Sequence, residues 1–142
     1  MANFLNKNIK FYLDNRIIFF PALQTILWGL WLINPYIDSF NISKNFGLLY
    51  VFGNEVEWGL FAILIGLSKI ISIFSTNPKY ALLSVFPFML GVFLWTTVLI
   101  SYVFGNPSSM GVASSVGFLV GAIVCLEDAM RRYYYTFHDG GI

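Results

Sequence analysis

Lys69 and Gln24 are the polar side chains most able to do chemistry inside the apolar parts of this chain. Lys69 is the only charged residue well inside an apolar run, and a charge at a membrane centre costs at least about 2.5 kcal/mol on insertion scales. Because it lies near the end of its run, we expect its aliphatic stem to carry the ammonium out to the lipid headgroups. If Lys69 faces the interior of a bundle instead, it is the best candidate for an anion or gating site. Gln24 is typical of a hydrogen bond between helices.

A cluster of charged residues follows the last apolar run. Glu127 and Asp128 precede Arg131 and Arg132 by four residues each, a spacing that brings an acid and a base together on one helical face. Such pairs ordinarily form a solvated helix end and contribute about 0.3–0.5 kcal/mol each. We therefore favour a structural role over catalysis for these four side chains.

Residue counts argue against several kinds of site. With one cysteine, Cys125, and one histidine, His138, the chain cannot form an intramolecular dithiol pair or supply paired haem ligands or a metal cluster. It has no phosphate-binding glycine loop and no basic stripe for nucleic acid. No acid lies in the middle of an apolar run, which argues against proton-coupled export. We expect a non-enzymatic protein without a catalytic, cofactor-binding or metal-binding residue and without a nucleic-acid partner.

Four apolar stretches must position the side chains named above, at about 17–33, 58–74, 80–104 and 110–126. The composition is 58% apolar and 11% charged, whereas soluble domains carry about 25% charged residues. About 20 apolar residues cross the hydrocarbon core as a helix, and these runs lack the alternation of barrel strands. We predict a single all-α membrane domain over residues 1–142, folded as an antiparallel bundle of four transmembrane helices.

The basic residues predict how this bundle is oriented. Seven of the eight lie on one side of the topology, so the positive-inside rule places both termini in the cytoplasm. The stretch at about 2–14 is amphipathic, and we predict an interfacial helix whose lysines meet anionic lipid. Asp14-Asn15-Arg16 then marks the bend into the first span. A partner-binding or gating role for this stretch is the alternative.

The outer loop at about 34–57 is the only long connection of this topology. Its second half, Phe46–Gly53, is too apolar for a free loop and too short to span a bilayer, which is typical of an interfacial or re-entrant segment. A segment in that place could line a pore entrance or a ligand cleft. We favour simple packing on the lipid interface, as for most short apolar runs.

Small residues recur at helical spacing in three of the four predicted spans. Such stripes let helix backbones approach closely in lipid, where no hydrophobic force drives helices together. They serve contacts within the monomer or, if one faces outward, contacts between copies. The predicted packing residues are Pro21, Thr25 and Gly29 in the first span, Gly59, Ala62 and Gly66 in the second, and Ala113, Gly117, Gly121 and Cys125 in the fourth.

A series of short motifs runs through the first half of the chain. They are Leu27-Trp28-Gly29-Leu30, Pro35, Asp38-Ser39-Phe40, Glu57-Trp58-Gly59, Phe61 and Gly66. In this order they resemble small four-helix membrane proteins encoded by tailed bacteriophages. The resemblance implies insertion into the bacterial host's inner membrane and roles such as lysis, exclusion of later phages or passage of material through the envelope. It brings no catalytic residues.

Three functional hypotheses follow. The first is a self-associating protein that modifies the membrane, as a holin-like permeabiliser or in exclusion, with Lys69 and Gln24 as polar groups of a lumen. The second is an accessory or assembly subunit of a larger membrane complex, in which the same stripes dock on a partner. The third is a small-molecule carrier or membrane enzyme with a cavity under the outer loop, lined by Gln24, Glu57 and Trp58. The lipid bilayer is the common partner of all three.

Overall fold

The computed structural model describes residues 2–36, 47–74, 81–105 and 110–139, and within these ranges it is helical without strands. The elements are α1 (Ala2–Ile33), α3 (Gly47–Phe52), α4 (Glu55–Phe74), α5 (Ala81–Gly105) and α6 (Met110–Asp139). The prediction of an all-α fold is confirmed. Residues 37–46 of the outer loop, including Asp38-Ser39-Phe40, lie outside the described residues.

Three of these helices are long and apolar enough to cross a membrane. The apolar segments of these helices are Glu55–Phe74, Ser84–Gly105 and Met110–Tyr134. The apolar part of α1, Ile18–Ile33, is shorter. Helices of this length and composition indicate an integral membrane protein.

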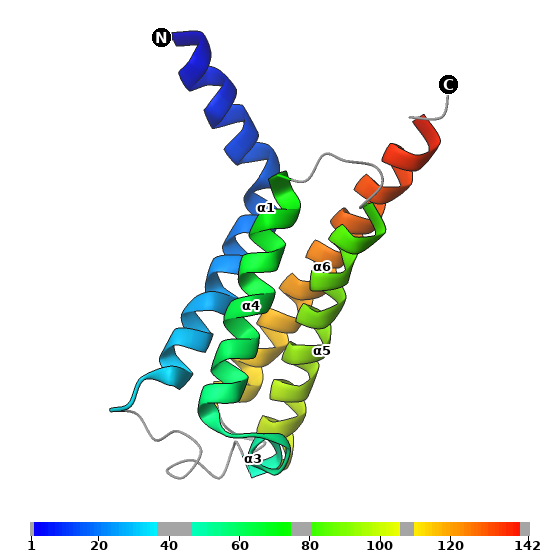
Figure 1. Ribbon diagram of the computed structural model, residues 1–142. Helices are drawn as coiled ribbons and strands as arrows, with labels where there is room; N and C mark the ends of the chain where they lie inside the picture. Colours follow the sequence, from blue (N-terminus) through cyan, green and yellow to red (C-terminus); the bar gives the residue numbers. More distant parts are fainter. Residues whose placement is uncertain (1, 37–46, 75–80, 106–109, 140–142) are drawn as a thin grey trace.

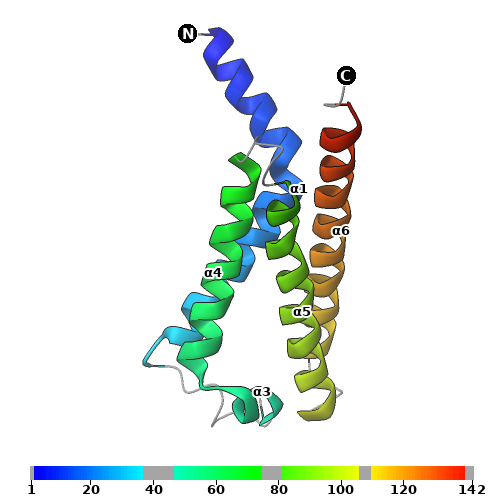
Figure 2. The same ribbon diagram turned by 45° about the vertical axis from the view of Figure 1, so that its right-hand side comes forward.

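The four long helices lie side by side, each antiparallel to the one before it, so that α1 begins and α6 ends at the same end of the bundle (Figure 1). The most extensive contacts join α1 to α4 and α5 to α6, and α4 packs against α5 over a smaller surface. The contact between α1 and α6 is smaller still, and Figure 2 shows the pair α1 and α4 diverging from the pair α5 and α6 toward α3. The bundle is therefore two tight helix pairs joined mainly through α4 and α5.

Helix α1 is continuous through the predicted bend at Asp14-Asn15-Arg16. α1 nevertheless changes direction beside the end of α4 (Figures 1 and 2), and Pro21 lies inside the helix, where its ring crowds the carbonyl group four residues before it. The predicted separate helix at 2–14 is thus the first part of α1, and it projects past the end of α4 (Figure 1).

Glycines set the close approach of α1 to α4. A methyl group at Gly29 would lie 2.6 Å from the carbonyl oxygen of Gly59, and one at Gly66 would lie 2.8 Å from the carbonyl oxygen of Ala22. Both obstacles are backbone atoms, so neither can rotate away as a side chain could. Gly59, Ala62 and Gly66 are all buried, because a spacing of three and then four residues keeps them on one helical face.

The start of α4 is fixed by a reciprocal cap. The Asn54 side chain accepts a hydrogen bond from the backbone N–H of Glu57, and the Glu57 carboxylate accepts one from the backbone N–H of Asn54, both at 2.9 Å. This is the capping-box arrangement, with asparagine in the place of serine or threonine. The indole N–H of Trp58 donates to the carbonyl oxygen of Leu49 at 3.0 Å, which attaches α3 to α4. Leu49 is fully buried, so the short apolar segment packs on the bundle.

We predict that Gly29→Ala lowers the free energy of unfolding by about 1–3 kcal/mol, the usual cost of overpacking. The added methyl group meets backbone, so α1 and α4 must move apart. Gly117→Ala is the matched control: a methyl group there has nothing within 4 Å, and alanine is the better helix former. Unfolding of both variants in dodecyl maltoside, followed by circular dichroism, checks this. Equal stability of the two variants would contradict the assigned contact.

Candidate functional site

Lys69 lies in the interior of the bundle. Its relative exposure is 0%, and its side chain packs over Gly91 of α5, where a methyl group would overlap Nζ and lie 2.7 Å from Cε. Nζ is 6.0 Å from the ring centroid of Phe88. Among the described residues, Nζ has no hydrogen-bond partner.

The expectation that Lys69 extends its ammonium to the headgroups is wrong. The side chain points between α4 and α5 because Gly91 leaves room for it at their contact. An amine removed from water without a partner is costly, and polar groups retained inside spans are by default functional. Lys69 thus faces the interior of the bundle, the condition set above for treating it as the best candidate for an anion or gating site.

The four predicted lumen or ligand residues do not form one site. Glu57 and Trp58 share a groove, whereas Lys69 lies twelve residues further along α4, about 18 Å away by helical rise. Gln24 is partly buried on α1 and does not line that groove. Of the three residues predicted to line a cavity under the outer loop, two line the groove and the third, Gln24, does not.

The groove beside α3, called the α3 groove below, has a volume of about 620 Å³. It is lined by Phe52, Gly53, Glu57, Trp58, Phe61, Phe93 and Thr97. Its floor is aromatic, and its single charged lining residue is Glu57. A volume of this size lies within the range of small-molecule sites, about 300–1,000 Å³.

A smaller cavity of about 230 Å³, the tryptophan pocket, lies between α1, α5 and α6. Trp95 of α5 is one of the lining residues, and its ring centroid lies 5.4 Å from that of Trp28 of α1 and 4.7 Å from that of Phe118 of α6. Ser115 borders it but donates its hydroxyl to the carbonyl oxygen of Gly111 at 2.7 Å. Sequence reasoning missed this pocket, because its residues come from three helices whose mutual rotation the sequence does not specify.

The predicted stripe on α6 divides between two environments. Cys125 is fully buried and a methyl group at Gly121 would lie 4.0 Å from Cγ of Pro21, whereas Ala113 and Gly117 are exposed. Residues four apart turn about 40° around a helix at each step, so the stripe rotates away from α1 along its length. Its open part continues an exposed face of small and β-branched residues, the α6 open face, made of Ala113, Val116, Gly117, Val120 and Val124.

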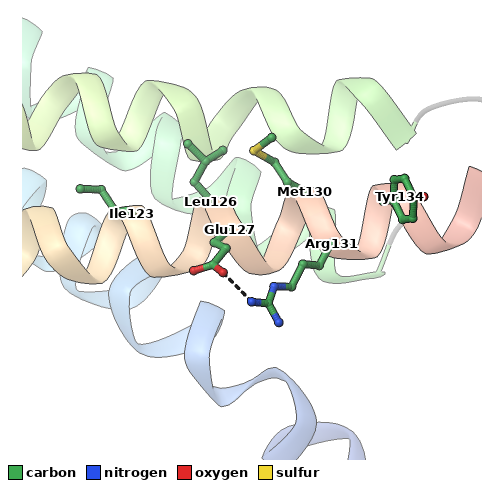
Figure 3. Close-up of a pocket in the computed structure, with 6 residues that line it drawn as sticks. All are labelled: Ile123, Leu126, Glu127, Met130, Arg131 and Tyr134. Carbon is green, nitrogen blue, oxygen red and sulfur yellow. Dashed lines mark hydrogen bonds and ion pairs between the residues drawn. The ribbon is translucent and has the colours of Figure 1, made fainter.

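The other end of α6 carries the predicted charge pairs, and Figure 3 shows the pair of Glu127 and Arg131. Arg131 donates to Glu127 at 2.6 Å and Arg132 to Asp128 at 2.7 Å. Side-chain exposures of 70% and 60% for the first pair place it in solvent, where an ion pair contributes about 0–1 kcal/mol. A shallow groove of about 550 Å³ beside this pair is lined by α6 residues.

Comparison with known proteins finds no matching family, no similar curated protein and no similar solved structure. The described residues contain no group of three histidine, cysteine, aspartate or glutamate side chains able to hold a metal ion. The functional assignment therefore depends on the buried amine, the α3 groove and the α6 open face.

We predict that Lys69→Met raises the free energy of unfolding by about 1–3 kcal/mol, because it removes a buried amine that makes no hydrogen bond to the residues that the structure describes. Methionine fills nearly the same volume over Gly91. Ser115→Ala is the control in the opposite direction, since it removes a buried hydroxyl that is bonded and should cost about 1 kcal/mol. Unfolding in detergent measures both. A less stable Lys69→Met variant would show that the amine holds a partner in the native state.

Proposed function

We propose that this chain is a non-enzymatic integral membrane protein that self-associates through the α6 open face and thereby modifies the membrane around it. The main support for this proposal is that small residues on α6 are exposed. In the most apolar 18 residues of each candidate span, the buried share is 17% in α6, 28% in α4 and 33% in α5. Of the three candidate spans, the one with the longest series of small residues is thus also the least buried.

Physical chemistry of helices in lipid supports self-association at this face. Lipid provides no hydrophobic force between helices, so association depends on close backbone approach at small residues and on the van der Waals contact that follows. Gly117 allows that approach, because nothing lies within 4 Å of where its Cβ would be. Val120 and Val124, exposed at 54% and 44%, supply stiff side chains with little rotamer freedom to lose.

The proposal includes a topology of four spans with both termini in the cytoplasm. The apolar half of α1 is the fourth span, beside the three longer helices. Glu55 and Glu57 begin α4 at one end of the bundle, and Arg131 and Arg132 lie near the end of α6 at the other (Figure 1). By the positive-inside rule the end that carries Arg131 and Arg132 is the cytoplasmic one in this topology.

The modification we propose is permeabilisation of the holin kind, or exclusion, in the inner membrane of a bacterial host. In the described part of a single copy Lys69 is enclosed, so any lumen has to form between copies or by separation of α4 from α5. Lys69 and Gln24 are the polar groups available to it. The phage resemblance of the first half of the chain supports this setting.

Gly117→Leu should weaken self-association about tenfold, which corresponds to about 1.4 kcal/mol, because the larger side chain keeps helices apart. Energy transfer between labelled copies in phospholipid vesicles measures it. Expression of the same variant in bacteria with a potential-sensitive dye should also leave the membrane potential intact where the wild type collapses it. Gly117 suits this test better than Gly121, whose contact with Pro21 lies within the monomer.

Val103→Leu on α5 is the matched control, since Val103 is exposed at 44% but lies off the α6 open face. It should associate as the wild type does. If Gly117→Leu also associates normally, the α6 open face is not the contact between copies. A monomeric chain that copurifies with one other membrane protein in fixed ratio would replace the proposal with the accessory-subunit hypothesis.

A further inference from the structure

We propose that the α3 groove binds an amphiphilic cation, a molecule with an ammonium or similar cationic group attached to apolar rings or chains. This binding site does not depend on self-association. Two observations carry the proposal: the hydrogen-bonding groups of the groove are acceptors, and the rest of its lining is aromatic.

The lining residues contribute two side-chain donors, and both are already engaged. The indole N–H of Trp58 donates to the carbonyl oxygen of Leu49 at 3.0 Å. The hydroxyl of Thr97 donates to the carbonyl oxygen of Phe93 at 2.9 Å. Neither can donate to a ligand without breaking a bond within the protein, whereas the Thr97 oxygen keeps lone pairs that can accept.

The backbone donors at the mouth of the groove are engaged as well. The N–H of Gly53 donates to Leu49, that of Asn54 to the Glu57 carboxylate, and that of Trp58 to the carbonyl oxygen of Asn54. An anionic or acceptor-rich ligand would find these donors already engaged and would meet the charge of Glu57. A ligand that donates hydrogen bonds or carries positive charge would meet acceptor groups and the attraction of the Glu57 carboxylate.

Glu57 supplies the charge that selects the ligand. It is exposed at the end of α4, and the capping contact with Asn54 holds its side chain in place. A methyl group at Gly53 would lie 2.8 Å from Oε2 of Glu57, so the absence of a side chain at that position keeps the carboxylate accessible from the groove. The carboxylate is thus a fixed anion at the edge of an apolar surface.

The aromatic lining suits both parts of such a ligand. Phe52 and Phe93 are exposed at 72% and 57%, and Trp58 and Phe61 pack edge to face with centroids 6.1 Å apart. Aromatic faces attract cations within about 6 Å of the ring centroid, most strongly for tryptophan, and bury apolar groups equally well. The groove therefore offers an aromatic surface with one carboxylate at its edge and no basic side chain among its lining residues.

The test uses tetraphenylphosphonium and tetraphenylborate, two probes of the same shape and opposite charge. Binding to the purified full chain in dodecyl maltoside is measured by equilibrium dialysis, with protein-free micelles subtracted. We expect saturable binding of the cation at one site per chain and no saturable binding of the anion. Equal binding of the two probes would overturn the proposal, because it would show an apolar surface without charge selection.

Glu57→Gln should weaken binding of the cation about tenfold, or about 1.4 kcal/mol, while the Gln side-chain oxygen still accepts from the Asn54 N–H. Glu55→Gln is the matched control: it makes the same change in net charge in the first turn of α4, outside the groove lining, and should change affinity less than about twofold. Equal affinity of Glu57→Gln and the wild type would overturn the proposal.

Phe93→Leu provides a second, independent variant, since this exposed side chain can change without disturbing the core. It should weaken cation binding by removing an aromatic face, and unchanged affinity would contradict the aromatic part of the site. Addition of phosphatidylethanolamine to the micelles then identifies the source of the cation. Displacement of the probe assigns the groove to a lipid amine, and its retention assigns the groove to a free amphiphile.

Discussion

The backbone contact between α1 and α4 is the constraint on which the rest of this bundle depends. In lipid, helices gain no hydrophobic energy by meeting, so a pair that must stay together needs close contact over much of its length. Gly29 with Gly59, and Ala22 with Gly66, provide it. Once that face of α4 is covered by α1, its remaining faces are fixed as well. One directs Lys69 toward α5, and the end of the helix presents Glu57 and Trp58 beside α3.

Glycine has a different role between α4 and α5. Gly91 does not bring the two backbones together but makes room for the long side chain of Lys69. The interior thus holds an amine where an apolar side chain would pack at lower cost. Burial of this amine weakens the contact between the two helix pairs, which is already smaller than the contact within each pair. The buried amine therefore lies at the contact between the two helix pairs, where it faces Gly91 of α5.

The helices could be predicted from the sequence, because apolar length and the need to satisfy backbone hydrogen bonds decide them together. Their mutual rotation could not. Hydropathy places Lys69 near the end of a run but does not say which neighbour it faces, so its burial against Gly91 was missed. The tryptophan pocket was missed for the same reason. The groove beside Glu57 and Trp58 was foreseen only in part: these two residues were named for a cavity near the loop, whereas Phe93 and Thr97 come from α5.

Spacing explains why small-residue patterns on different helices have different consequences. On α4 the steps of three and four residues cancel most of the drift of the helix, so that Gly59 and Gly66 both face α1 and Ala62 between them is buried. On α6 every step is four residues, so the stripe turns by about 120° between Ala113 and Cys125. It begins in an exposed position and ends in the core. A uniform stripe of this kind cannot serve a single neighbour along its whole length. Because Gly121 and Cys125 pack inside the monomer at one end of the stripe, Ala113 and Gly117 at its other end face outward. The α6 open face is a geometric consequence of that packing.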